Sequence, residues 1–223
     1  MSFRGSVRRA LAAPQGASLT QRFPAPLVTV LVGDAALGSH DEMALAEVAE
    51  ALSRVGVPRG RMMTLLSGTL PIDAARRGRA REMHDMLGMP VVLHDPGEGP
   101  SFTVGTTPGG LLVQLDDELR EAEGVVLVGE FANDPVRGAH GGPFALLPGL
   151  ASAETLSRLV ALQRDCGPGS GHEVLLEAAR AMLALVKVDL AVVWDESDPP
   201  TVQAGGGDML AILLEQGWGD RKR

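Results

Sequence analysis

Residues 27–34 read Leu-Val-Thr-Val-Leu-Val-Gly-Asp, an apolar and largely β-branched run that stops at a glycine and an aspartate. An unbroken apolar run is typical of a strand that is buried on both faces, as the strands of parallel sheets are. A short loop follows, and from Asp41 onward apolar side chains recur at helical spacing until Gly56 and Pro58 end the pattern. The stretch therefore predicts a strand, a loop and a helix.

The same alternation repeats along the chain. Further strands are predicted at 62–66, 90–93, 124–129 and 188–194, hairpins within 102–115 and near 201–204, and helices at 72–87, 153–163, 172–185 and 209–216. Strands that alternate with helices predict an α/β fold, with a mostly parallel sheet and helices on both faces, in a Rossmann-like three-layer domain. Such domains bind ligands beyond the carboxyl ends of their strands, here at Asp34, at Gly68 and in the loop-rich segment 130–149. The arginines of the helix at 72–87 are expected on a solvated face, because the chain is acidic overall.

Charge and cysteine usage exclude several classes of protein. The 223 residues include 20 basic and 28 acidic side chains, and the net charge of −8 argues against a nucleic-acid partner. Cys166 is the single cysteine, which excludes an intrachain disulfide framework and fits a reducing cytoplasm. No apolar run approaches the roughly 18 to 20 residues that a membrane span needs. We expect a cytoplasmic protein without a membrane partner, whose residues 1–22 form a loose, basic tail that can be disordered.

Four stretches occur in a fixed order and carry a recognisable pattern. They are Val-Val-Leu-His-Asp at 91–95, Val-Gly-Thr-Thr-Pro-Gly-Gly at 104–110, Glu-Ala-Glu-Gly at 121–124, and the segment 138–155 that begins Gly-Ala-His-Gly-Gly and ends Ala-Glu-Thr. The series resembles the amino-terminal domain of the lactate racemase family, bacterial-like enzymes that invert 2-hydroxy acids with a nickel pincer nucleotide. The resemblance implies one such domain over residues 23–223, without the second domain of the family.

The chain departs from the family pattern where the pattern carries chemistry. The resemblance implies a cofactor-binding lysine at the place of Phe144, a nickel-ligating histidine at Val160 and a catalytic histidine at Leu70. Phenylalanine has no amine, valine has no lone pair, and leucine cannot carry a proton. The resemblance also implies arginines where this chain has Leu37 and Pro143, a histidine where it has Asp134, and an asparagine where it has Leu159. We therefore expect no cofactor and no metal.

What remains is suited to binding rather than to racemisation. The residues expected to bind a ligand are Asp34, Gly68, Thr69, His140, Gly141 and Gly142. They supply backbone shape and hydrogen bonds, which fits a pseudoenzyme that holds a small polar or anionic molecule or docks a partner protein. A further hypothesis is a subunit that pairs with another chain, or with a second copy of itself, through the face that the second domain would cover.

The alternative is an active isomerase or racemase of 2-hydroxy acids whose catalytic groups have moved. Its candidates are His140, Asp134 and His94, with a separate subunit closing the cleft. Each also has a structural interpretation: His94, at a strand end, can bond to a nearby backbone group, and His140 can be a solvated loop residue. Whether the chain is an enzyme stays open at this level.

Overall fold

One mostly parallel sheet forms the centre of the molecule. The structure is a computed structural model that describes residues 2–25, 27–34, 38–68, 72–134, 138–166, 171–195 and 197–217. Within them, six strands pair in the order β10-β9-β6-β1-β2-β3, and all are parallel except β10, which runs antiparallel to β9. The strands are β1 (Thr29–Asp34), β2 (Met62–Ser67), β3 (Val91–Leu93), β6 (Gly124–Glu130), β9 (Leu190–Trp194) and β10 (Val202–Gly205). The predicted α/β fold is confirmed.

Strand β1 lies in the interior of the sheet, between β2 and β6. Its side chains alternate between two apolar cores, with Val30 and Val32 in one core and Leu31 in the other. All three are fully buried. An unbroken apolar strand is the expected result, because a sheet covered on both faces leaves no solvated side for polar residues.

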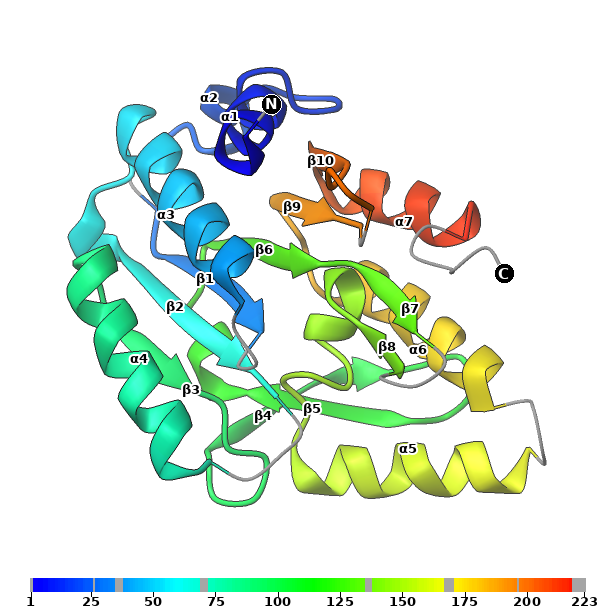
Figure 1. The fold of residues 1–223 in the computed structure, drawn as a ribbon. Coiled ribbons are helices and arrows are strands. Elements are labelled where there is room, and N and C mark those ends of the chain that lie inside the picture. Colours follow the sequence, from blue (N-terminus) through cyan, green and yellow to red (C-terminus); the bar gives the residue numbers. More distant parts are fainter. Residues whose placement is uncertain are drawn as a thin grey trace.

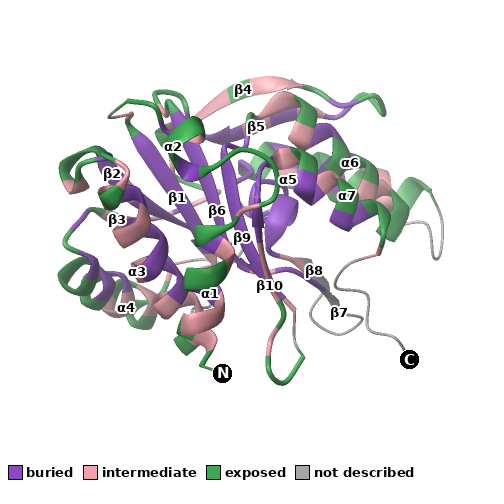
Figure 2. Cartoon of the chain, turned by 90° about the horizontal axis from the view of Figure 1, so that it is seen from above, coloured by how far each residue is buried: buried purple, intermediate pink, exposed green. Residues whose placement is uncertain are grey.

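Helices cover both faces of the sheet (Figure 1). One face carries α1 (Phe3–Ala12), α3 (Ser39–Arg54) and α4 (Ala74–Leu87), and the other carries α5 (Ala153–Asp165), α6 (Gly171–Leu185) and α7 (Gly207–Glu215). Figure 2 shows the buried strands between these two layers. Short helical segments are also present, among them α2 (Leu19–Arg22), η1 (Arg59–Arg61) and η2 (Asp117–Leu119).

Two hairpins within the described residues lie outside the main sheet. The first, β4 (Ser101–Thr106) with β5 (Leu112–Asp116), was expected within 102–115. The second pairs β7 (Ala132–Asp134) with β8 (Gly138–His140) and leads into the 3-10 helix η3 (Gly142–Ala145). The described parts of the segment, 130–134 and 138–149, are thus more regular than their glycine content suggested, because backbone groups pair where a loop was expected.

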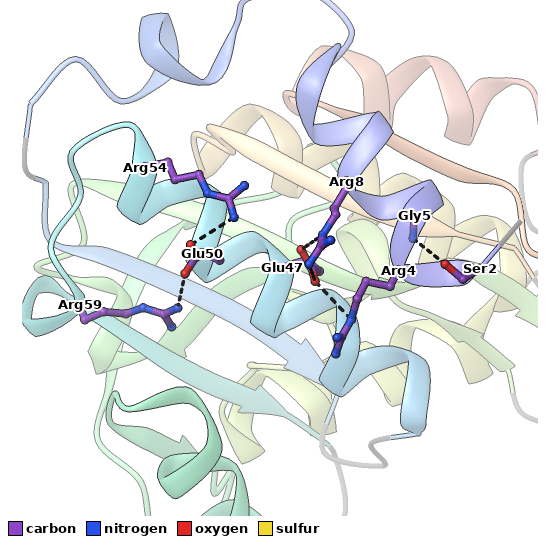
Figure 3. Close-up of polar contacts among 8 residues, drawn as sticks. All are labelled: Ser2, Arg4, Gly5, Arg8, Glu47, Glu50, Arg54 and Arg59. Carbon is purple, nitrogen blue, oxygen red and sulfur yellow. Dashed lines mark hydrogen bonds and ion pairs between the residues drawn. The ribbon is translucent and has the colours of Figure 1, made fainter.

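The expectation of a loose tail over residues 1–22 is wrong. Residues 3–12 form α1, whose Val7 and Leu11 are buried against the rest of the fold. Two arginines of α1 bind one carboxylate on α3: Nε of Arg4 lies 3.2 Å and Nε of Arg8 lies 2.7 Å from an oxygen of Glu47 (Figure 3). The basic residues that suggested a tail have an acidic partner in the tertiary structure, and the apolar ones have a core.

No helix within the described residues has both the length and the apolar character that a membrane crossing requires.

Candidate functional site

Three carboxylates gather where the central strands end. Asp34 is the last residue of β1, Glu130 is the last residue of β6, and Asp41 lies in the first turn of α3. Oδ2 of Asp41 accepts a hydrogen bond of 2.8 Å from the backbone N–H of Gly38. Burial raises the pKa of Asp41 to about 6, against the effect of this hydrogen bond and with the nearby charges of Asp34 and Glu130 adding to the rise. The edge is therefore acidic and partly shielded from water.

His140 joins the same group of side chains. It ends β8, and its Nε2 lies 3.5 Å from Oε1 of Glu130. The next two residues explain how this approach is possible. A Cβ atom on Gly141 would lie 1.5 Å from the carbonyl oxygen of Glu130, and one on Gly142 would lie 3.0 Å from the ring of Phe131. The two glycines, both with positive φ, let the chain pass close to β6 and so place His140 beside Glu130.

A pocket of about 380 Å³ opens next to Glu130. Its walls include His40, Trp194 and Asp195 as well as Glu130. The ring of Phe3, in α1, stacks on His40 at 4.1 Å between centroids and meets Trp194 edge-on at 5.2 Å. The amino-terminal helix thus supports one wall of this pocket.

His94 lies in a different environment from His40 and His140. Its side chain is buried, Nδ1 lies 2.6 Å from Oδ2 of Asp116, and Nε2 lies 3.0 Å from the carbonyl oxygen of Ala151. A carbonyl can only accept, so Nε2 carries a proton, and both ring nitrogens are engaged within the fold. His94 therefore links the end of β3 to β5 and to the segment before α5, which is the structural role weighed for it.

The remaining predicted residues have mixed outcomes. The backbone N–H of Gly68 donates to the carbonyl of Gly149 at 2.8 Å, so it is not open to a ligand. Asp34 pairs in register with Ser67 of β2 and stands at the acidic edge described above. Thr69, Leu37 and Leu70 lie outside the described residues, and the side chain of Asp134 does as well.

Sequence reasoning missed two members of this edge. Glu130 follows Gly129 at the end of an apolar strand, and Asp41 was considered only as the start of a helical pattern. The signal for Glu130 was present in its position, since the residue after a buried parallel strand lies at the ligand-binding edge. The signal for Asp41 was absent, because its raised pKa comes mainly from burial, which depends on how the whole chain folds.

The places that the resemblance assigns to cofactor chemistry do not suit a nickel pincer nucleotide. Phe144 is 2% exposed and packs on Phe131 with 6.0 Å between ring centroids. Val160 is 49% exposed on α5 and has no donor atom. In the part of the chain that the structure describes, no three His, Cys, Asp or Glu side chains are placed to hold a metal ion. These residues provide neither an amine for covalent attachment nor a ligand set for nickel.

Comparison with known proteins relates this chain to the lactate racemases in sequence and in fold. The family model described as the lactate racemase N-terminal domain matches residues 3–160. The lactate racemase apoprotein from Thermoanaerobacterium thermosaccharolyticum is similar in structure, with a TM-score of 0.73 and 18% identity over 98% of this chain and 54% of that one. A crystal structure of a Thermotoga maritima protein from a structural genomics programme has a TM-score of 0.63 and 14% identity over 97% of this chain and 57% of that one. The chain thus spans little more than half the length of these two proteins. No curated protein sequence matches it.

Proposed function

This chain belongs to the lactate racemase N-terminal domain family, and we propose that it is a ligand-binding member that has lost the nickel-dependent racemase chemistry. The observation that carries the proposal is the burial of Phe144, which stands where the family resemblance expects the lysine that holds the cofactor. The proposed ligand is a small polar molecule at the edge formed by Asp34, Asp41, Glu130 and His140.

Phe144 supports the loss of cofactor attachment in two ways. It has no nucleophilic atom, and it contributes to the apolar core together with Phe131 and Leu147. A lysine in the same orientation would place an ammonium group among apolar side chains, at a high desolvation cost. Restoring the family residue would therefore also require a movement of η3.

The acidic edge supports binding of a molecule that donates hydrogen bonds or carries positive charge. Asp34, Asp41 and Glu130 are acceptors when ionised, and together they repel anions. The electrostatics thus favour the polar member of the two ligand classes considered from the sequence and disfavour the anionic one. The adjacent pocket of about 380 Å³ falls in the range of about 300 to 1,000 Å³ that small-molecule sites occupy.

Loss of the cofactor is tested by producing the chain in cells that also make the nickel pincer nucleotide. Nickel is then measured in the purified protein by elemental analysis, with an intact lactate racemase from the same cells as the positive control. We expect the control to carry nickel and this chain to carry far less than one atom per molecule. One nickel atom per chain would overturn the proposal.

Binding is tested separately by saturation-transfer NMR with a library of small polyols, amines and hydroxy acids. Glu130→Gln should weaken the binding of the polyols or amines that are found, because it removes an ionised acceptor. Glu98→Gln is the matched control, since it removes the same charge from an exposed loop. Binding of hydroxy acids alone, or equal binding by both variants, would contradict the assignment of the site.

A further inference from the structure

A groove beside the edge strand β3, separate from the acidic site, combines positive charge with a strand edge that no other described strand covers. It has a volume of about 460 Å³ and lies between α4 and β3. Ala80, Val91 and Leu93 form its apolar floor, and four exposed residues of α4 stand along its rim: Arg77, Arg81, His84 and the acidic Asp85. Strand β2 separates β3 from β1, so the groove is not part of the acidic site.

The rim residues form one stripe on α4. Positions 77, 81 and 84 are four and three residues apart, which places their side chains on the same helix face. The neighbouring Arg79 is different, because it forms ion pairs with Glu42 and Glu82. Arg77 and Arg81 are exposed and make no ion pair with another described residue. Arg77 and Arg81 outweigh Asp85, so the groove lining keeps a net positive charge in a chain of net charge −8.

Strand β3 ends the sheet, so its outer side is available for pairing within the described structure. The N–H of Thr64 donates to the carbonyl of Pro90, and the N–H of His94 donates to the carbonyl of Leu66. These bonds show that the even-numbered residues of this stretch face β2. Successive backbone groups alternate in direction along a strand, so the N–H and C=O groups of Val91 and Leu93 point to the outer side.

From these observations we infer that the groove between α4 and β3 binds an extended acidic segment of a partner polypeptide, which adds to the sheet beside β3. The main chain of the segment pairs with Val91 and Leu93, as in other cases of strand addition. Its carboxylates face Arg77 and Arg81, and its apolar side chains cover the floor of the groove. Charge complementarity selects an acidic partner over a second copy of the same strand.

The experiment is a selection from a library of seven-residue peptides displayed on phage, with the full chain immobilised as the target. We expect enrichment of sequences that alternate Asp or Glu with apolar residues. A synthetic peptide of the enriched sequence should bind the Arg77→Glu, Arg81→Glu double variant at least tenfold more weakly. Arg180→Glu is the control for a charge reversal elsewhere, because Arg180 is exposed on α6, away from the groove. It should change the affinity for the peptide by less than twofold. Affinity should also fall as salt increases, since exposed charges are screened.

Strand addition has its own readout. The largest shifts in amide NMR signals should fall on Val91 and Leu93. Only every second N–H group of an added peptide strand pairs with β3. N-methylation of that alternate set of nitrogens should abolish binding, and N-methylation of the other set should not. Circular dichroism and a thermal melt confirm that the double variant is folded, as expected for a change of exposed side chains.

Several results would overturn the inference. They are the absence of enrichment, enrichment of neutral or basic sequences, binding that survives N-methylation of either alternate set of peptide nitrogens, or unchanged binding by the double variant. The same holds if inorganic phosphate alone displaces the peptide at equal concentration, or if light scattering shows the chain pairing with itself through this edge. None of these results depends on the acidic site, so the outcome is separate from that of the proposed function.

Discussion

Nδ1 of His94 lies 2.6 Å from Oδ2 of Asp116, and both side chains are shielded from solvent. The contact ties the carboxyl end of β3 to the end of the β4–β5 hairpin, and the bond from Nε2 to Ala151 extends the link to the segment before α5. A histidine that a motif search would place among catalytic candidates therefore connects three parts of the fold. The partner of His94 is not the adjacent Asp95 but Asp116, which lies 22 residues further along the chain.

Replacing His94 by alanine should destabilise the protein by about 3 to 5 kcal/mol, because it leaves the buried Asp116 carboxylate without its partner. Unfolding in urea measures the change. His84→Ala removes the same side chain from an exposed position on α4 and should change stability by no more than about 0.5 kcal/mol. Equal stability of the two variants would refute the role assigned to His94.

The raised pKa of Asp41 predicts a pH dependence of stability. Its pKa is about 6 in the folded state and 3.8 in the reference state, so the folded protein binds the proton more tightly. This contribution to stability is fully present below pH 3.8 and is lost as the pH rises through about 6. Asp41→Asn should therefore gain stability relative to the parent protein between pH 4 and pH 7.

Urea unfolding of both proteins at the two pH values gives that comparison, and an NMR titration of the Asp41 carboxyl carbon reports its pKa directly. A difference in unfolding free energy that does not change with pH would show that the carboxyl group titrates normally.

Breaking the contact between α1 and α3 should release the amino-terminal helix. Glu47→Ala removes the carboxylate that Arg4 and Arg8 share, so we expect faster tryptic cleavage within residues 4–9 and faster amide exchange in α1. Glu50→Ala is the matched control, because Glu50 is more exposed and binds Arg54 and Arg59 instead (Figure 3). If cleavage rates of the two variants agree, the shared carboxylate does not hold the helix.

Gly141 and Gly110 both have positive φ, but only Gly141 is also packed closely against another part of the backbone. Comparing alanine variants of the two therefore distinguishes the cost of backbone strain from the cost of a steric clash. Gly141→Ala should cost several kcal/mol or prevent folding, because its Cβ would overlap the carbonyl oxygen of Glu130. Gly110→Ala has a similar φ of +83° but no neighbour within 4 Å, so it should cost only about 1 to 3 kcal/mol. Thermal melts of both variants provide the test, and the close approach is refuted if the two losses of stability are the same.

Local patterns in the sequence determined the sheet. The run at 27–34 identified the buried strand β1, since an apolar strand needs cover on both faces. The β4–β5 and β9–β10 hairpins were visible in short stretches separated by glycine, proline or aspartate. The family was also recognisable, because its glycine-rich segments occur in a fixed order. These features depend on residues that are close together in the chain.

Only the tertiary structure decided which of the polar residues act together. It turned residues 3–12 into a packed helix through Glu47, gave His94 a buried partner, and brought Asp41 and Glu130 to the edge that holds Asp34 and His140. It also left Arg77 and Arg81 beside an open strand. The physical reason is the same in each case: electrostatic and hydrogen-bonding partners are set by distance in space. Spacing along the chain does not reveal a pair such as Arg8 and Glu47, which are 39 positions apart.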